Sequence, residues 1–552
     1  MPFDTRQPLS IQAARTINVG RGSGGGGGGL PAPAGTWQYP ANEDWYATGS
    51  REMYLVGPHP DPVTDPTSEV DPNAGHLWAS PDFAYEQDLF VIFGSPPWHF
   101  ELLEGPTGMV IGEFMQVENG LLKYHKDYGK VIWPNPTNVG QPADGWLVRV
   151  RVRDQDFNRG HSELIAEWRL KVDANKFLVI ANGGDNANPG TWAQPKADFD
   201  GWYLGDETST QFEGMHVVFR GGSYVPRGDF ENANGNIAMW RNGGRHPKTF
   251  IVPRGETVNF DCSEANWLWW SNPDDIAFKG HFVFNGSKTQ NPDGSSIANC
   301  RNMTMVPAGN NRFYMSEVEI KDLVPGSAGT DNPAFLWRSS GGGVRGANFG
   351  FKSCAFDGAT ASSNGPGTFL VSSTNYIANI GHSLKNWKSF GGFGEKSSCK
   401  YNCMYFIDAW DAENNCGNTI GSLNTHSYDA IGTGGGDYLY NKSWNGLESI
   451  GAGWGTTANE THETMTFKRN TGKGRPKIGG NIDVVIDKSL QFGEYYGVTP
   501  AVLPVLQEGD NLFGQTPNDI DQYVNNATGE ITDQIILGKY GATLVDPATL
   551  QN

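Results

Sequence analysis

The sequence predicts an all-β protein in which short strands repeat without helices between them. Short apolar strands recur along about half of the chain, at intervals typical of repeat architectures. The segments between them are short and rich in glycine, asparagine and serine, which argues against crossover helices. Of the 552 residues, 73 are glycine and only 18% are charged, unlike a coiled coil or long-helix protein. A chain of this length has room for roughly two to four domains.

Residues 1–36 form a segment distinct from the rest. Residues 1–22 are polar and irregular, and "SGGGGGGLPAPAG" follows at 23–35. The glycine run predicts a flexible joint, and the Pro/Ala stretch after it predicts a stiffer spacer. We therefore expect residues 1–22 to be a peptide that docks on another protein through a linker; the alternative is a disordered tail with no role.

Residues 37–213 predict a β-rich N-terminal domain. In "WLVRVRVRD" (146–154), the valines share one face of a strand, while Arg149, Arg151 and Arg153 share the other. These arginines would suit an anionic ligand, but an exposed sheet face or a charge-protected edge is the favoured interpretation. "NGGDNANPG" (182–190) has the residue types of a calcium-binding loop without its spacing, and it predicts a plain loop.

The repeat occupies residues 214–500. Its first strands start at positions 217, 237, 258, 282 and 303, which are nearly evenly spaced. Later strands start at 318, 349, 376 and 405, at wider intervals. The frame of a leucine-rich repeat is missing, and an antiparallel sandwich would fit about as well locally. The steady spacing favours a solenoid in which each turn pairs with the next.

Three stretches carry a family resemblance. "NFGFKSCAF" (348–356) alternates apolar residues, makes a polar turn and continues with a Cys and a Phe; "GHFVFNG" (280–286) and "NCRNMTMVPAGNN" (299–311) are similar. This pattern resembles the right-handed parallel β-helix of pectate lyases and phage tailspikes. The resemblance implies that residues 214–500 form such a β-helix. It implies that four residues of this stretch lie in the interior: Phe349, Phe351, Cys354 and Phe356. It implies that Lys352 and Ser353 lie at the corner and on the outer surface.

Within that family, the chain looks most like a bacteriophage tailspike or head fibre. The resemblance implies a virion protein, usually a homotrimer, that binds host cell-surface polysaccharide and is docked on another virion protein by residues 1–22. Residues 501–552 would be a C-terminal cap or trimerisation segment, since the last turn of a solenoid exposes an edge that must be covered. The N-terminus shows no apolar segment of a secretory signal, so we expect synthesis in the host cytoplasm and a place in the virion.

Composition argues against several other partners. The formal net charge of -19 repels phosphate backbones and anionic membrane surfaces, so nucleic acid is a poor candidate. No apolar run approaches the ~18 residues of a membrane span, so no insertion is expected. Cys399, Cys403 and Cys416 lie close in sequence but lack an evident fourth ligand, so we expect buried reduced thiols and no metal. No phosphate-binding loop or other cofactor motif is present, so no cofactor is expected.

The strongest candidate for chemistry is "YFIDAWDAEN" (405–414). If Tyr405 points inward, Asp408 and Trp410 point outward, as a sugar site would need. Asp437 follows about one period later, and strands ~4.8 Å apart could bring two carboxylates to the ~5–5.5 Å of a retaining glycosidase. The candidate catalytic residues are Asp408, Asp437, Glu413 and Asp429, and the candidate glycan-binding residues are Trp410, Phe406, His426, Trp267 and Trp270. The alternative is ordinary polar turns, with the tryptophans of "NWLWWSN" (266–272) packed in the core or a subunit interface.

Two functions therefore lead the interpretation. A non-catalytic spike that binds host polysaccharide is slightly favoured over a depolymerase, a hydrolase or lyase of the same architecture. A secreted polysaccharide-degrading enzyme is disfavoured by the missing signal, and a purely structural virion protein remains an alternative.

Overall fold

The computed structural model divides the chain into two compact units. The first comprises Met1–Phe114 and Asp127–Ala174, and the second comprises Met115–Lys126 and Asn175–Asn552. The structure describes residues 15–16, 53–57, 75–92, 94, 96–112, 115–118, 121–154, 163–197, 215–224, 237–240, 249–261, 267–271, 276–285, 302–306, 313–321, 335–337, 349–357, 368–371, 374–377, 380–382, 392–393, 403–405, 408–410, 420–422, 437–439, 442–443, 448–452, 465–473, 475–478, 484–487, 489–492, 505–506, 512–515, 520–526, 529–533, 541–542 and 544–545.

Within these residues the protein is mostly β and contains very little helix. The helical elements described are the short helix α1 (Ile520–Tyr523) and the 3-10 turns η1 (Gly75–Leu77) and η3 (Ala174–Lys176). None of the helices in the described part is long and apolar enough to cross a membrane. The sequence-based expectation of a β-rich chain without crossover helices is confirmed at this level.

The first unit is built from mainly antiparallel sheets. Its five-stranded sheet contains β1 (Arg15–Thr16), β12 (Glu163–Val172), β11 (Trp146–Arg153), β6 (His99–Glu104) and β3 (Trp78–Ala79). The smaller sheets contain β4 (Tyr85–Asp88), β10 (Lys130–Trp133) and β7 (Val110–Ile111), and β2 (Tyr54–Gly57) with β5 (Phe90–Ile92). Val148, Val150 and Val152 of β11 are fully buried, as their alternation with arginine predicts.

The arginines of β11 are paired within their own sheet. Strand β11 lies between β12 and β6, so it is not an edge strand. On the two flanking strands, Arg149 meets Glu167 and Glu104, Arg151 meets Glu101, and Arg153 meets Glu163. The charges of the three arginines are thus balanced by neighbouring glutamates, as expected for a charged sheet face. The alternative expectation, that β11 is an edge strand protected by charge, is wrong.

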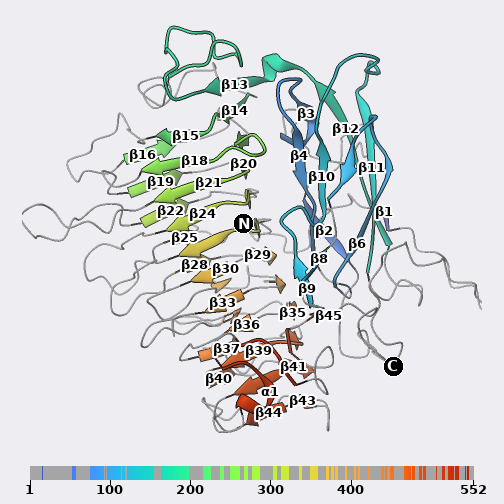
Figure 1. Ribbon diagram of the computed structural model, residues 1–552, viewed down its shortest axis with the longest axis vertical. Coiled ribbons are helices and arrows are strands. Elements are labelled where there is room, and N and C mark those ends of the chain that lie inside the picture. Colours follow the sequence, from blue (N-terminus) through green and yellow to red (C-terminus); the bar gives the residue numbers. More distant parts are fainter. Residues whose placement is uncertain are drawn as a thin grey trace, which may run out of the picture. The chain divides into compact units, whose positions relative to one another are not determined.

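The second unit contains three parallel sheets that the chain visits in rotation. Successive strands pass to different sheets, and every third strand returns to the same one, for most of the unit. Figure 1 shows these strands following one another in chain order, from green to red.

The twelve-stranded sheet contains β13 (Phe177–Ile180), β14 (His216–Phe219), β17 (Thr249–Ile251), β20 (Ile276–Lys279), β23 (Phe313–Ser316), β26 (Phe349–Lys352), β29 (Thr374–Ile377), β32 (Cys403–Tyr405), β35 (Asp437–Leu439), β38 (Met465–Lys468), β41 (Val484–Asp487) and β43 (Val505–Leu506). The eleven-stranded sheet contains β15 (Gly222–Tyr224), β18 (Val258–Asp261), β21 (Phe282–Asn285), β24 (Glu319–Lys321), β27 (Ala355–Asp357), β30 (Ile380–His382), β33 (Asp408–Trp410), β36 (Lys442–Ser443), β39 (Thr471–Lys473), β42 (Leu490–Phe492) and β44 (Leu512–Gln515). The nine-stranded sheet contains β16 (Ile237–Trp240), β19 (Trp267–Ser271), β22 (Asn302–Val306), β25 (Phe335–Trp337), β28 (Thr368–Val371), β31 (Gly392–Phe393), β34 (Ile420–Ser422), β37 (Glu448–Ala452) and β40 (Arg475–Ile478).

The strand spacing expected from the sequence holds for some successive strands of one sheet and fails for the first strands of the repeat. The strands that start near 217, 237 and 258 are β14, β16 and β18, which belong to three different sheets. Strands β18 and β21, which begin at 258 and 282, are consecutive in one sheet, and so are β26, β29 and β32, which begin at 349, 374 and 403, close to the intervals expected from the sequence. The expected spacing of the first strands mixed different sheets, because alternation marks a strand without marking its sheet.

Aromatic side chains stack in the interior of the second unit. Phe250 and Phe278 lie 4.9 Å apart, and Phe260 and Phe284 lie 5.1 Å apart, each pair being cross-strand partners in register. Because parallel in-register strands align equivalent side chains, each turn extends these stacks.

The stretch around residue 351 fits this core with one exception. Phe351 and Cys354 are buried, as the sequence predicts, and the Cys354 sulfur lies 3.6 Å from Met315 O and 3.5 Å from Lys352 O, within hydrogen-bond reach of both carbonyls. Lys352, expected on the outer surface, is 1% exposed, so that expectation is wrong. At the preceding corner, Lys126 Nζ lies 3.3 Å from Glu317 Oε2.

A left-handed residue marks the corner between the twelve- and eleven-stranded sheets. Four residues that each directly follow a strand of the twelve-stranded sheet have positive φ values: Gly280 (94°), Glu317 (61°), Ser353 (54°) and Arg469 (50°). Such values are uncommon for residues other than glycine. Backbone bonds continue across the corner, for example from Gly280 N to Ser316 O at 3.2 Å.

Both ends of the chain contribute strands to these units. Of residues 1–36, the structure describes Arg15–Thr16, which pair with β12 in the first unit. Within 501–552, β43 and β44 extend two of the parallel sheets, and β45 (Leu544–Val545) pairs with β9 (Leu121–Tyr124), which also pairs with β8 (Met115–Glu118).

Candidate functional site

The residues singled out in the sequence lie at several places. Asp408 and Trp410 belong to β33, Asp437 begins β35, and Trp267 and Trp270 belong to β19. The remaining candidates fall outside the described residues: Phe406, Glu413, His426 and Asp429.

The register separates the two aspartates proposed as a pair. Asp408 lies opposite Ile380 and Lys442 in the eleven-stranded sheet, whereas Asp437 lies opposite Thr466 in the twelve-stranded sheet. The turn here runs from position 408 to position 442, so it ends beyond Asp437. The expected stacking of Asp408 with Asp437 on adjacent turns is therefore wrong, because the loop lengthens this turn.

The two tryptophan positions of β19 are three residues apart in the strand. Positions 267 and 270 are separated by an odd number of steps along the strand and so belong to its opposite faces. In register, position 267 lies opposite Asn302, and position 270 lies opposite Trp240 and Met305.

A row of polar side chains instead follows the corner at the start of the second unit. Its members come from the loop after β13 and from four successive corners that lead into β15, β18, β21 and β24. We call it the corner row, and it consists of Trp192, Arg220, Glu256, Thr257, His281 and Glu319. Strands β15, β18, β21 and β24 are consecutive in their sheet, so three strand spacings of ~4.8 Å give the row a length of about 14 Å.

One end of the row is an aromatic ring with a charge pair. The guanidinium carbon of Arg220 lies 3.9 Å from the centroid of the Trp192 ring. Arg220 Nε donates to Glu256 Oε1 at 3.0 Å, and the Gly221 N–H donates to the same carboxylate. The ion pair holds the Arg220 and Glu256 side chains in one geometry. Their side chains are 34% and 25% exposed, so both remain within reach of solvent.

The other end of the row is a chain of three polar groups. Thr257 Oγ1 lies 2.9 Å from His281 Nδ1, and His281 Nε2 lies 3.6 Å from Glu319 Oε2. His281 is 45% exposed, so its ring is open to solvent while both nitrogens face partners. Each side chain lies at or just before the start of a different strand of the eleven-stranded sheet, and the parallel pairing of these strands aligns them.

The loop that carries Trp192 is locked from within. Lys196 Nζ donates to the carbonyl oxygens of Asn186 at 2.9 Å and Asn188 at 2.8 Å. Asn188 Nδ2 in turn donates to Pro195 O at 2.9 Å. The stretch at 182–190 is a loop, as the sequence predicts, and the Lys196 ammonium is bonded to two of its carbonyl groups. Trp192 is thus presented on a pre-organised loop.

Sequence reasoning missed the corner row. Its members are far apart in the chain and share no motif, and only the register of successive turns brings them together. The local sequence signal that could have pointed to the row is the placement of polar residues at strand starts. Thr257, His281 and Glu319 each lie at or just before the start of a strand.

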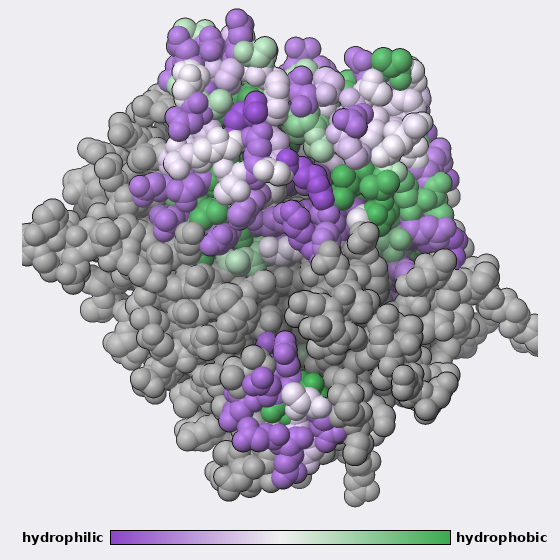
Figure 2. Space-filling view, viewed as in Figure 1, coloured by the Kyte–Doolittle hydropathy of each residue, from purple (hydrophilic) through white to green (hydrophobic). Residues whose placement is uncertain are grey.

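The corner row offers stacking and hydrogen bonds but few metal ligands. An indole ring, a guanidinium, two carboxylates, a hydroxyl and an imidazole provide both donors and acceptors. Within the described part of the chain, no group of three or more His, Cys, Asp or Glu side chains could hold a metal ion. On the face shown in Figure 2, the described surface is mainly hydrophilic with small hydrophobic patches. Such a row suits a ligand with many hydroxyl groups.

Comparison of the chain with protein-family models, curated proteins and solved structures finds no match.

Proposed function

We propose that the protein is a virion-attached spike that binds host cell-surface polysaccharide, and that its second unit is a right-handed parallel β-helix. Three parallel sheets visited in rotation, with every third strand paired, support a β-helix, because a chain that winds in one direction produces this order. The tailspike resemblance of residues 348–356 supports the spike. A homotrimer docked on the virion by residues 1–22 belongs to the same proposal.

The corner row is the observation that carries the binding function. A polysaccharide lying along the stacking direction would meet one set of polar groups at each turn. The Trp192 ring would stack on the apolar face of a sugar, and the Arg220–Glu256 pair would donate to and accept from its hydroxyl groups. Because the pair is already assembled, little side-chain freedom is lost on binding.

Binding of purified bacterial capsular and O-antigen polysaccharides to the full chain tests this proposal. A buried or stacked tryptophan at a binding site is typically worth about 2 kcal/mol, so Trp192→Ala should weaken a bound polysaccharide roughly thirtyfold. Trp78→Ala, the same change at a half-buried tryptophan of the first unit, should leave affinity unchanged. Equal affinity of wild type and Trp192→Ala would exclude the corner row, and absence of binding across the panel would refute the function.

The same samples test the catalytic alternative. Release of reducing ends by the wild-type protein would favour a depolymerase over a binding spike. Loss of that release in Asp408→Asn or Asp437→Asn would assign it to those residues, although the register places Lys442 rather than Asp437 opposite Asp408. Deletion of residues 1–14, which retains strand β1, should leave a folded protein that no longer joins particles, and normal incorporation would refute the anchoring role.

A further inference from the structure

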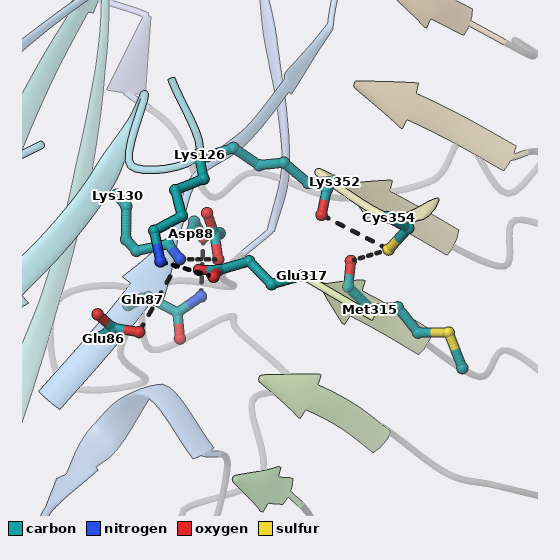
Figure 3. A network of polar contacts seen from close by, with 9 residues as sticks. All are labelled: Glu86, Gln87, Asp88, Lys126, Lys130, Met315, Glu317, Lys352 and Cys354. Atoms are coloured by element: carbon teal, nitrogen blue, oxygen red, sulfur yellow. Dashed lines mark hydrogen bonds and ion pairs between the residues drawn. The ribbon is translucent and has the colours of Figure 1, made fainter. Parts of the chain in front are cut away.

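The first unit contains a buried lysine between two carboxylates. Lys130 of β10 is 1% exposed, and its Nζ lies 3.8 Å from Asp88 Oδ2 and 3.9 Å from Glu86 Oε2, both on β4. Figure 3 shows the end of Lys130 directed toward these two side chains. Asp88 is 4% exposed, so the lysine and its nearer partner are both withdrawn from water.

Strand pairing holds these groups in place. Lys130 and Asp88 are direct cross-strand partners in an antiparallel pair, and Glu86, two positions along β4, shares their face of the sheet. The β-carbons of such a pair are about 4.5–5.5 Å apart, a gap that an amide between the two side chains spans without stretching the strands. Ile132, which shares the face of Lys130 on β10, is buried, and so is Tyr128, two positions before Lys130, so buried apolar side chains flank the site.

We propose that Lys130 and Asp88 join spontaneously in an intramolecular isopeptide bond, with Glu86 as the proton carrier. Burial disfavours separated charges, which promotes transfer of the ammonium proton to a carboxylate and leaves a neutral amine beside a neutral acid. Reacting groups held about 3–3.5 Å apart behave as an intramolecular pair of very high effective concentration. Rotation of the long lysine side chain supplies this approach.

The reaction balances with water as its only by-product. The Lys130 Nζ lone pair attacks Asp88 Cγ and forms the new C–N bond. Glu86 accepts a proton from the nitrogen and delivers it to the departing hydroxyl group of Asp88, so the C–O bond breaks and water leaves. Glu86 ends in its starting state, and no oxidant, reductant or cofactor takes part.

The bond would tie β4 to β10 and close a covalent loop from position 88 to position 130. It would prevent the two strands from separating when the unit is pulled or heated. The inference is independent of the polysaccharide-binding function, because it concerns the first unit alone.

Intact-mass measurement of the full chain under denaturing conditions tests the proposal. The wild type should be lighter than its sequence mass by one water, about 18 Da, and a proteolytic digest should contain a cross-linked peptide joining residues 88 and 130. Lys130→Arg and Glu86→Gln should each have the full sequence mass. Asp88→Asn should form the same amide with loss of ammonia, about 17 Da, which keeps the test informative if another variant fails to fold.

A matched internal control is present in the same digest. Lys126 and Glu317 form an ion pair at 3.3 Å, closer than Lys130 and its partners, but Lys126 is 53% exposed. Their peptides should remain unlinked. A wild-type mass equal to the sequence mass would overturn the proposal and leave a buried ion pair. A water loss that persists in Lys130→Arg would also overturn it, since the water would come from another site.

Discussion

The corner glycine Gly280 provides a direct test of how closely successive strands of the second unit pack. Gly280 has φ +94°, and a β-carbon there would lie 2.4 Å from the carbonyl oxygen of Val252 on the preceding turn. Gly255 has a similar φ of +84°, but a β-carbon there would meet nothing within 4 Å. Substitution of either glycine by alanine has the same backbone cost, and only Gly280→Ala adds a collision.

The expected costs follow from these geometries. A left-handed alanine costs about 1–2 kcal/mol, and the stiffer unfolded chain offsets about 0.4–1 kcal/mol, so Gly255→Ala should destabilise the unit by about 1 kcal/mol. In Gly280→Ala the turn must also shift, which strains the bonds from Val252 N to Lys279 O at 2.8 Å and from Gly280 N to Ser316 O at 3.2 Å. With about 1 kcal/mol for each strained bond added to the backbone cost, Gly280→Ala should destabilise the unit by about 3 kcal/mol.

Hydrogen exchange of peptides covering β17, β20 and β21 measures the difference locally. Exchange through local opening should accelerate about fivefold in Gly255→Ala and about a hundredfold in Gly280→Ala, since each 1.4 kcal/mol is a factor of about ten. The urea midpoint of the second unit should fall in the same order. Equal acceleration in the two variants would refute the reasoning, because the close approach of successive turns would then carry no energetic weight.

Three further predictions concern the core, the first unit and the Trp192 loop. Phe260→Ala should destabilise the second unit by about 3–5 kcal/mol, while Phe260→Leu should restore most of that loss in urea titration; equal effects would contradict the aromatic stack. Burial, and then nearby Arg153, lower the pKa of His99 from 6.5 to about 4. The unfolded chain therefore binds a proton between these pH values that the folded chain does not, and the first unit should lose roughly 3 kcal/mol as pH falls through this range. His99→Asn should remove that part of the pH dependence in thermal unfolding, and an unchanged slope would contradict it. Lys196→Met should speed hydrogen exchange in the loop 182–197 and weaken polysaccharide binding, whereas unchanged exchange would show that the ammonium does not hold the loop.

Several features of the fold were predictable because they depend on local patterns. The alternation of valine and arginine in 146–154 predicted both the strand and its buried face, since successive side chains point to opposite faces of a strand. Gly- and Asn-rich segments excluded crossover helices, and Phe351 and Cys354 are buried as their spacing predicted. The loop at 182–190 was likewise recognised by its residues and their spacing.

Other features depended on lengths that local patterns do not encode. The turn from β33 to β36 runs from position 408 to position 442, so Asp437 falls in a different sheet from Asp408. Lys352 looked like a surface residue, yet it is 1% exposed. Neither outcome has a signal in the residues beside it.

By itself the sequence determined that the chain is β-rich, that it repeats, and which side chains of several strands are buried, because alternation and turn residues act over a few positions. Only the tertiary structure decided which strands share a sheet and which side chains meet across turns. The corner row and the Lys130 site consist of residues brought together by strand register, and register is set by loop lengths and packing between distant segments. Chemistry shared by distant residues is therefore visible only once the strands are paired in register.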